Sequence, residues 1–101
     1  MKKFVNGVEN ILSESLTGFG KAHSGIVKIN LSPDFIYRAK ENKKDKVAVI
    51  SGGGSGHEPL HGGFVGYGML DAACPGQIFS APTPDQMEAA ANRVHSGKGI
   101  L

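Results

Sequence analysis

The chain is poor in several features that would place it in a specialised class of protein. It has one cysteine among 101 residues, which excludes an intramolecular disulfide and a zinc site built on cysteines. No apolar run approaches the ~20 residues of a membrane span. The N-terminus carries lysines but no apolar segment of the length that a secretory signal requires. These absences predict a soluble, cytoplasmic protein.

Net charge is also low. Eleven basic and nine acidic residues give +2, too little to indicate a nucleic-acid or membrane-surface partner. The lysine-rich residues 40–46 have the composition of a solvated loop, with phosphate binding as the less favoured alternative. A hydrophobic content of 40% and a charged content of 20% are typical of globular proteins. The length limits the chain to one domain at most.

Apolar spacing and turn signals divide the chain into helices and strands. Apolar residues three and four apart predict a helix over residues 7–20, with Asn6 and Glu9 as an N-terminal capping box. Alternation predicts a half-buried strand over 26–31, and 35–38 is a second short extended segment. The β-branched run 46–50 predicts a strand covered on both faces. Residues 71–80 predict a short strand, a turn and another strand.

The last helix has the clearest boundaries. Thr83 is its expected N-cap, Pro84 occupies the first helical position, and Gln86 completes a Thr-x-x-Gln capping box. The helix is predicted to run to about His95. Residues 99–101 then have the pattern of the start of another buried strand, and a domain rarely ends at such a point. We therefore expect a single, incomplete domain from a longer protein.

The strongest indication of function is SGGGSGHEPLHGG, residues 51–63, directly after the predicted strand 46–50. Glycine allows positive φ and close approach to a ligand, and open α/β sheets bind ligands at the carboxyl ends of their strands. We expect an active-site loop, with a flexible turn as the alternative. Ser55 offers hydroxyl and amide donors. His57 is a ligand contact or proton acceptor, or else a helix cap, and His61 is expected to support His57 or to pack.

Known phosphate and metal motifs do not fit this segment. The glycines are followed by His57 and Glu58 where a Walker A sequence requires lysine and serine or threonine, and no register satisfies G-x-G-x-x-G. The string HEPLH, residues 57–61, matches the zinc motif H-E-x-x-H. The preceding glycines and Pro59 conflict with the helix that this motif needs, and no third ligand is evident. We expect no metal site.

The chain resembles the N-terminal part of the dihydroxyacetone kinase substrate-binding subunit, the DhaK family. The resemblance runs from MKKFVNGVENIL through SGGGSGHEPLHGGFVGYGML to ACPGQIFSAPTPDQ. It implies an α/β domain with a mixed sheet flanked by helices, and a homodimer in the full protein. It also implies that dihydroxyacetone is phosphorylated to dihydroxyacetone phosphate. The residues matching the family's triose-binding loop are Gly54, Ser55, Gly56 and His57, and His57 matches its catalytic proton acceptor.

The resemblance further implies an incomplete catalytic set. The family's aspartate that assists proton transfer and its histidine that forms a hemiaminal both lie beyond Leu101, so the fragment alone is expected to be inactive. No cofactor is expected on this chain, because the family's phosphoryl donor is an ADP-bearing partner subunit, recharged through the phosphotransferase system, or ATP. Ala81 replaces a serine that contacts substrate in the family. The contact is lost unless neighbouring Ser80 replaces it, which the alternation of side chains along a strand disfavours. Ala81 therefore gives some support to the alternative function, a non-catalytic dihydroxyacetone-sensing coactivator.

Overall fold

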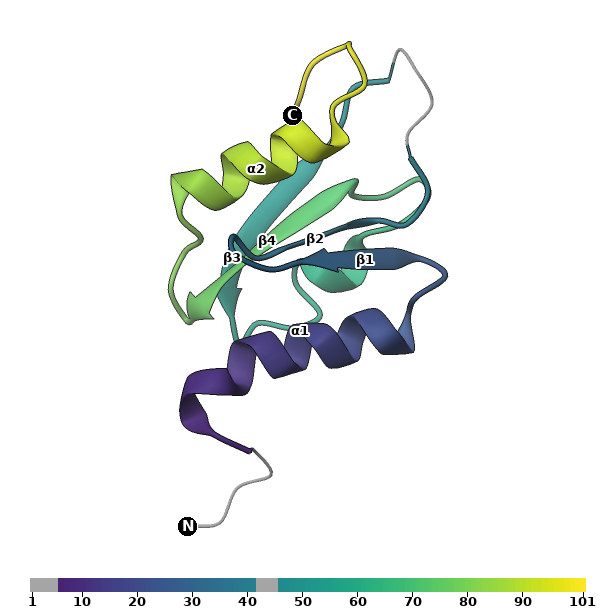
Figure 1. Ribbon diagram of the computed structural model, residues 1–101. Helices are drawn as coiled ribbons and strands as arrows, with labels where there is room; N and C mark the ends of the chain where they lie inside the picture. The colour runs from purple at the N-terminus through teal and green to yellow at the C-terminus, as the bar shows by residue number, and fades with distance from the viewer. Residues whose placement is uncertain (1–5, 42–45) are drawn as a thin grey trace.

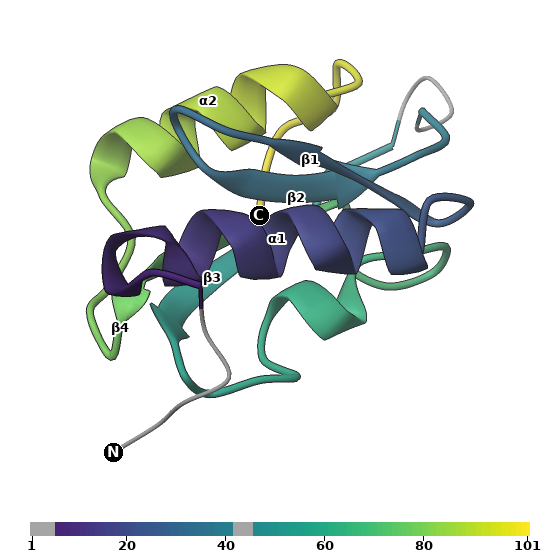
Figure 2. The same ribbon diagram turned by 60° about the horizontal axis from the view of Figure 1, so that its bottom comes forward.

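A four-stranded sheet with a helix on each face forms the centre of the structure, a computed structural model that describes residues 6–41 and 46–101 (Figures 1 and 2). In chain order the elements are the 3₁₀ turn η1 (Val8–Asn10), α1 (Ile11–Ala22), β1 (Val27–Asn30), β2 (Phe35–Arg38), β3 (Ile50–Ser55), the 3₁₀ turn η2 (Gly62–Phe64), β4 (Ala72–Ile78) and α2 (Pro84–Val94). The strand order is β1-β2-β4-β3. β3 and β4 are parallel and the other two pairs are antiparallel. The predicted class, α/β with a mixed sheet flanked by helices, is confirmed.

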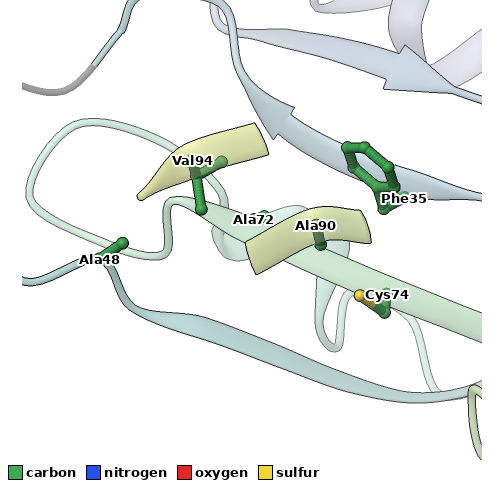
Figure 3. Packing of buried hydrophobic residues seen from close by; sticks show 6 residues of the cluster. All are labelled: Phe35, Ala48, Ala72, Cys74, Ala90 and Val94. Carbon is green, nitrogen blue, oxygen red and sulfur yellow. The ribbon is translucent and has the colours of Figure 1, made fainter. Parts of the chain in front are cut away.

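Consecutive residues of the strands face opposite helices, so the core has two halves. The half under α2 contains Phe35, Ala48, Ala72, Cys74, Ala90 and Val94 (Figure 3). The half under α1 contains Leu16, Val27, Ile36, Val65 and Ala73. This alternation along β2 and β4 is the two-residue period of a strand with both faces covered. The alanines are small, which lets α2 pack close to the sheet.

The first helix starts and ends later than predicted. The predicted capping box does not form, because no side chain caps η1 or α1. Instead, Asn6 Nδ2 donates a hydrogen bond of 2.9 Å to Glu14 Oε2, in the first turn of α1. Gly20 does not end α1. A Cβ there would lie 2.6 Å from Ile29 Cγ1, so this glycine lets the helix lie close to β1.

The two parallel strands also differ from the prediction. β3 includes Gly52, Gly53 and Gly54, so the segment interpreted as a loop is mostly strand. Val47, expected to be buried, is 46% exposed. β4 is one continuous strand with no turn. Residues 99–101 pair with a strand segment, as their sequence pattern indicates. They run parallel to the segment that leads into β3, with a bridge between Ala48 and Ile100.

The cap of the second helix forms as predicted. Thr83 Oγ1 accepts from Gln86 N at 3.3 Å, and Gln86 Oε1 accepts from Thr83 N at 2.9 Å. Gln86 Nε2 also donates to the backbone oxygens of Asp34 and Pro75, at 2.9 and 2.7 Å. The capping residue thereby joins α2 to β4 and to the turn before β2.

At the other end of the sheet, where β4 begins, a buried carboxylate holds three neighbouring residues together. Asp71, directly before β4, is fully buried. Its Oδ1 accepts from Arg38 Nη1 at 3.2 Å, and its Oδ2 accepts from Lys46 Nζ at 2.7 Å and from Val49 N at 2.8 Å. Burial by itself raises the pKa of Asp71, but the donors from Lys46, Val49 and Arg38 outweigh it and hold the pKa below its usual value. This cluster lies at the amino end of β4, away from the carboxyl end where His57 lies, and we assign it a structural role.

Candidate functional site

The glycines of β3 are required by close packing and not by unusual backbone angles. A Cβ on Gly54 would lie 2.7 Å from the backbone nitrogen of Ser80, and one on Gly53 would lie 2.8 Å from His61 Nε2. Neither glycine has positive φ, whereas Gly56 has φ +109°. The expectation of positive φ therefore holds for Gly56 only. Gly53 and Gly54 let side chains and backbone approach the strand from its two sides.

The turn after β3 places His57 at the carboxyl end of the parallel strands. Phe79 N donates to Ser55 O at 2.7 Å, which ties the end of β3 to the chain leaving β4. The amide of Gly56 donates to Glu58 Oε2 at 2.9 Å. His57 is exposed and contacts the ring of Phe79 edge-on, with 5.1 Å between ring centroids. His57 thus has a defined position and an open imidazole, and it does not cap a helix.

Ser55 is not free to act through its hydroxyl hydrogen. Its side chain is buried, and Oγ donates to Gly76 O at 2.8 Å. This hydrogen bond holds β3 to β4 where their pairing is irregular, between Gly53 and Ser55. A ligand contact by Ser55 would therefore use the backbone or the lone pairs of Oγ.

His61 lies beside Ser51. Its Nδ1 is 3.0 Å from Ser51 Oγ. The expectation that His61 supports His57 does not match this contact, because the imidazole is held by the strand and not by the neighbouring histidine. His61 therefore belongs to the α1 side of β3, where its ring also faces Gly53.

A cavity of about 380 Å³ lies between α1 and the segment from β3 to η2. Its lining is mostly apolar, although we expected a small polar cavity. The lining includes Leu12, Ser15, Leu16, Phe19, Ile36, Gly53, Gly54, Ser55, Glu58, Leu60 and His61. Of the sequence-predicted site residues, the structure brings Gly54 and Ser55 to the cavity wall. Gly56 and His57 form the turn beside it, and His57 does not line it.

The described residues contain no arrangement typical of a metal site or a membrane helix. The HEPLH string forms turns leading into η2 and not a helix. Within 6–41 and 46–101, no group of three or more His, Cys, Asp and Glu side chains could hold a metal ion. Over the same residues, no helix is long and apolar enough to cross a bilayer. Cys74 is buried under α2, and burial raises the pKa of its thiol to about 11.

Two contacts of the site were missed in the sequence. Phe79 has φ +54° and faces His57, and nothing in its local sequence distinguishes it from a core aromatic residue. Glu58 closes the turn by accepting from the Gly56 amide. No standard turn signal places a glutamate in this role, so nothing in the sequence singles out Glu58.

Taken together, the parallel pair β3–β4 ends in a histidine-bearing turn beside a cavity, which is where open α/β sheets bind small ligands. The structure therefore defines an α/β domain with a candidate ligand site at the carboxyl edge of its parallel strands. The chain belongs to the Dak1 domain family, whose model matches residues 17–101. This confirms the resemblance found in the sequence.

Three known proteins show how close the similarity is. The dihydroxyacetone-binding subunit DhaK of the PEP-dependent dihydroxyacetone kinase of Escherichia coli is 48% identical over 101 residues, which is all of this chain and 28% of that protein. The crystal structure of the dihydroxyacetone kinase from C. freundii, in complex with AMP-PNP and Mg²⁺, matches 99% of this chain with a TM-score of 0.88 and 38% identity. The dihydroxyacetone kinase operon co-activator DhaQ matches 86% with a TM-score of 0.77 and 39% identity.

These relatives are much longer than this chain. The chain covers 28% of the E. coli subunit, 19% of the C. freundii kinase chain and 26% of the DhaQ chain. It therefore corresponds to less than a third of each.

Proposed function

We propose that this chain supplies the triose-binding part of a dihydroxyacetone kinase, which phosphorylates dihydroxyacetone to dihydroxyacetone phosphate. The observation that carries the proposal is the presentation of His57 by the Gly56 turn, next to a cavity lined by Gly54 and Ser55. It is supported by 48% identity to the dihydroxyacetone-binding subunit of E. coli.

In this proposal the strand end binds the triose and His57 accepts a proton. A hydroxyl oxygen of dihydroxyacetone attacks the phosphoryl group, the bond from phosphorus to the donor's leaving oxygen breaks, and the hydroxyl proton passes to His57. The exposed imidazole leaves room for a substrate hydroxyl on the side away from Phe79. The backbone of Gly54 forms part of the cavity wall on which the triose lies in this proposal. Positioning of this kind supplies most of the catalysis in phosphoryl transfer.

Ser55 and Gly56 contribute through the backbone. The hydroxyl hydrogen of Ser55 is bonded to Gly76 O, so this residue offers its main chain to the ligand. The amide of Gly56 is bonded to Glu58 Oε2, so a triose oxygen at Gly56 shares or displaces that carboxylate. Both residues hold the position from which His57 acts.

The remaining assignments rest on the family resemblance. We propose a cytoplasmic protein that forms a homodimer, with no cofactor held by this chain. The phosphoryl donor is an ADP-bearing partner subunit, recharged through the phosphotransferase system, or ATP. The PEP-dependent kinase named for the E. coli relative supports the first donor.

A second function is a non-catalytic coactivator that binds dihydroxyacetone. Two observations favour it: Ala81 stands where the family usually has serine, and the co-activator DhaQ has a similar structure. Against it, the C. freundii kinase matches more of the chain, 99% against 86%, and with the higher TM-score.

The two functions are separated by turnover in the full-length protein. The experiment combines it with dihydroxyacetone and, in separate reactions, with ATP or with an ADP-bearing donor subunit and its phosphoenolpyruvate-driven phosphotransferase components. The product dihydroxyacetone phosphate is measured, with glycerol as the control acceptor. The kinase assignment predicts product from one donor. Dihydroxyacetone binding by calorimetry without product from either donor would assign the coactivator function instead.

A further inference from the structure

His61 is the one imidazole held against the glycine strand from the cavity side. Its Nδ1 lies 3.0 Å from Ser51 Oγ, a partly buried contact. On the opposite edge of the ring, a Cβ on Gly53 would lie 2.8 Å from Nε2 and 2.9 Å from Cδ2. The ring therefore fills the space that Gly53 leaves open. Its orientation is fixed by one hydrogen bond and by contact with the strand backbone.

Nε2 of His61 remains available to a ligand. Every buried side-chain nitrogen or oxygen of the described residues has a hydrogen-bond partner. Nε2 has none among the same residues, so this atom keeps some exposure. It lies on the side of the ring that faces Gly53, and His61 lines the cavity together with Gly53 and Gly54. An accessible polar atom in a mostly apolar wall is the usual means by which a small-molecule pocket fixes the orientation of its ligand.

The other polar side chains of the cavity wall are already engaged or lie on the helix. The hydroxyl hydrogen of Ser55 is bonded to Gly76 O, and Oε2 of Glu58 accepts from Gly56 N. Ser15 lies on α1, across the cavity from the strand. On the strand side, Ser55 Oγ and the second oxygen of Glu58 can still accept a hydrogen bond, so His61 is the lining side chain there that can still donate one.

We propose that His61 is a substrate-binding residue, whose Nε2 hydrogen-bonds an oxygen of the triose, and that Ser51 is its positioning residue. With Ser51 Oγ–H donating to Nδ1, Nε2 carries the hydrogen and donates to a carbonyl or hydroxyl oxygen. This inference rests on the proposed function and adds to it a binding contact separate from the proton acceptor. Loss of His61 should weaken substrate binding, whereas loss of His57 should slow the chemical step.

The test uses two substitutions that separate the two ring nitrogens. Asparagine can replace the Nδ1 contact with Ser51 but does not reach the Nε2 position, whereas the amide of glutamine does. In the full-length protein, His61→Asn should raise KM for dihydroxyacetone about 3- to 10-fold, the effect of losing one hydrogen bond, with kcat within about 2-fold of wild type. His61→Gln should restore most of the affinity. Binding measured by calorimetry should follow KM.

Ser51→Ala provides an independent test that keeps the imidazole. It should raise KM in the same direction but less, because the ring loses its orientation and not its contact. Combined with His61→Asn it should add little, since the two residues act as one unit. Thermal unfolding of each variant shows whether it is folded, and Ser51→Ala keeps the inference testable if His61→Asn does not fold.

The outcomes distinguish this inference from the proposed function. Wild-type turnover together with an unchanged KM in His61→Asn and in Ser51→Ala overturns the role of His61 and leaves the proposed function standing. A fall in kcat without a rise in KM also overturns it, because a binding contact was expected. A wild-type protein that neither binds nor phosphorylates dihydroxyacetone overturns both.

Discussion

Gly54→Ala should destabilise the protein strongly, because the space around Gly54 is bounded by backbone. An added Cβ would lie 2.7 Å from Ser80 N, 2.9 Å from Phe79 C and 3.0 Å from Phe79 Cα. These atoms cannot move independently, since Phe79 N is bonded to Ser55 O at 2.7 Å and Ser80 N to Gln77 O at 2.9 Å. Relief of the clash requires β3 and the β4–α2 connection to separate.

Overpacking of this kind costs about 1–3 kcal/mol, and because the neighbours are backbone atoms we expect Gly54→Ala to cost at least the middle of that range. A loss of about 2 kcal/mol corresponds to a fall in Tm of roughly 8–16 °C in a domain of this size. The control is Gly18→Ala in α1, where a Cβ meets nothing within 4 Å. Alanine is favoured over glycine in a helix by roughly 0.5–1 kcal/mol, so this variant should raise Tm by a few degrees.

The measurement is thermal unfolding followed by circular dichroism, on wild type and both variants at one concentration. We expect the order Gly18→Ala, wild type, Gly54→Ala from highest to lowest Tm. A Tm for Gly54→Ala equal to or above that of wild type would show that the strand end is not packed against residues 79–80, and would refute the reasoning.

Three further predictions concern the buried groups and the histidine pair. Asp71→Asn should lower the free energy of unfolding by about 3 kcal/mol at pH 7, the lower end for breaking a buried ion pair, because Lys46 is partly exposed. The pKa of Asp71 is lowered in the folded protein. Its contribution to the free energy of unfolding is therefore fully present above the unfolded pKa of about 3.9 and is lost as the pH falls through the folded pKa. Urea unfolding at pH 7 and below pH 4 should show this loss in wild type and not in the variant. Cys74, with a thiol pKa of about 11, should react with a disulfide reagent at pH 8 far more slowly when native than when denatured, and equal rates would contradict its burial. Protein purified without a metal-chelating resin should contain well below one equivalent of zinc, and a stoichiometric ion on His57 and His61 would contradict our interpretation of the HEPLH string.

The elements that sequence predicts best are those whose signals are local. The cap of α2 depends on Thr83 and Gln86, three residues apart, and both hydrogen bonds form. The extended segment at 35–38 and the pairing of residues 99–101 follow from short apolar patterns in the same way.

The elements that sequence predicts poorly depend on distant neighbours. Glycine is unfavourable in strands on average, so the pattern at residues 52–54 indicates a loop. The structure keeps these residues in β3 because β4 and the chain after it approach too closely for side chains. Pro75 similarly suggests a turn. β2 pairs only with Ala72 and Ala73 of β4, so Pro75 lies where β4 has one neighbour fewer and proline is tolerated.

The site shows the same division. His57 follows from the motif and its position after a strand, but its partner Phe79 is 22 residues away and comes into contact only through the β3–β4 pairing. The contact between Ser51 and His61 likewise requires the chain to turn back under its own strand after Pro59. Nothing in the local pattern distinguishes these partners from core or surface residues.

The central claim, that His57 accepts the proton in phosphoryl transfer to dihydroxyacetone, is tested most directly by the turnover of His57→Ala in the full-length protein with its phosphoryl donor. Loss of a general base lowers the rate by ~10² to 10⁴, and Tm should stay near the wild-type value because the His57 side chain is exposed. His95→Ala is the matched control, an exposed histidine at the end of α2 and away from β3, and it should leave kcat unchanged. The account predicts at least a hundredfold lower kcat for His57→Ala alone, and a kcat equal to that of wild type would contradict it.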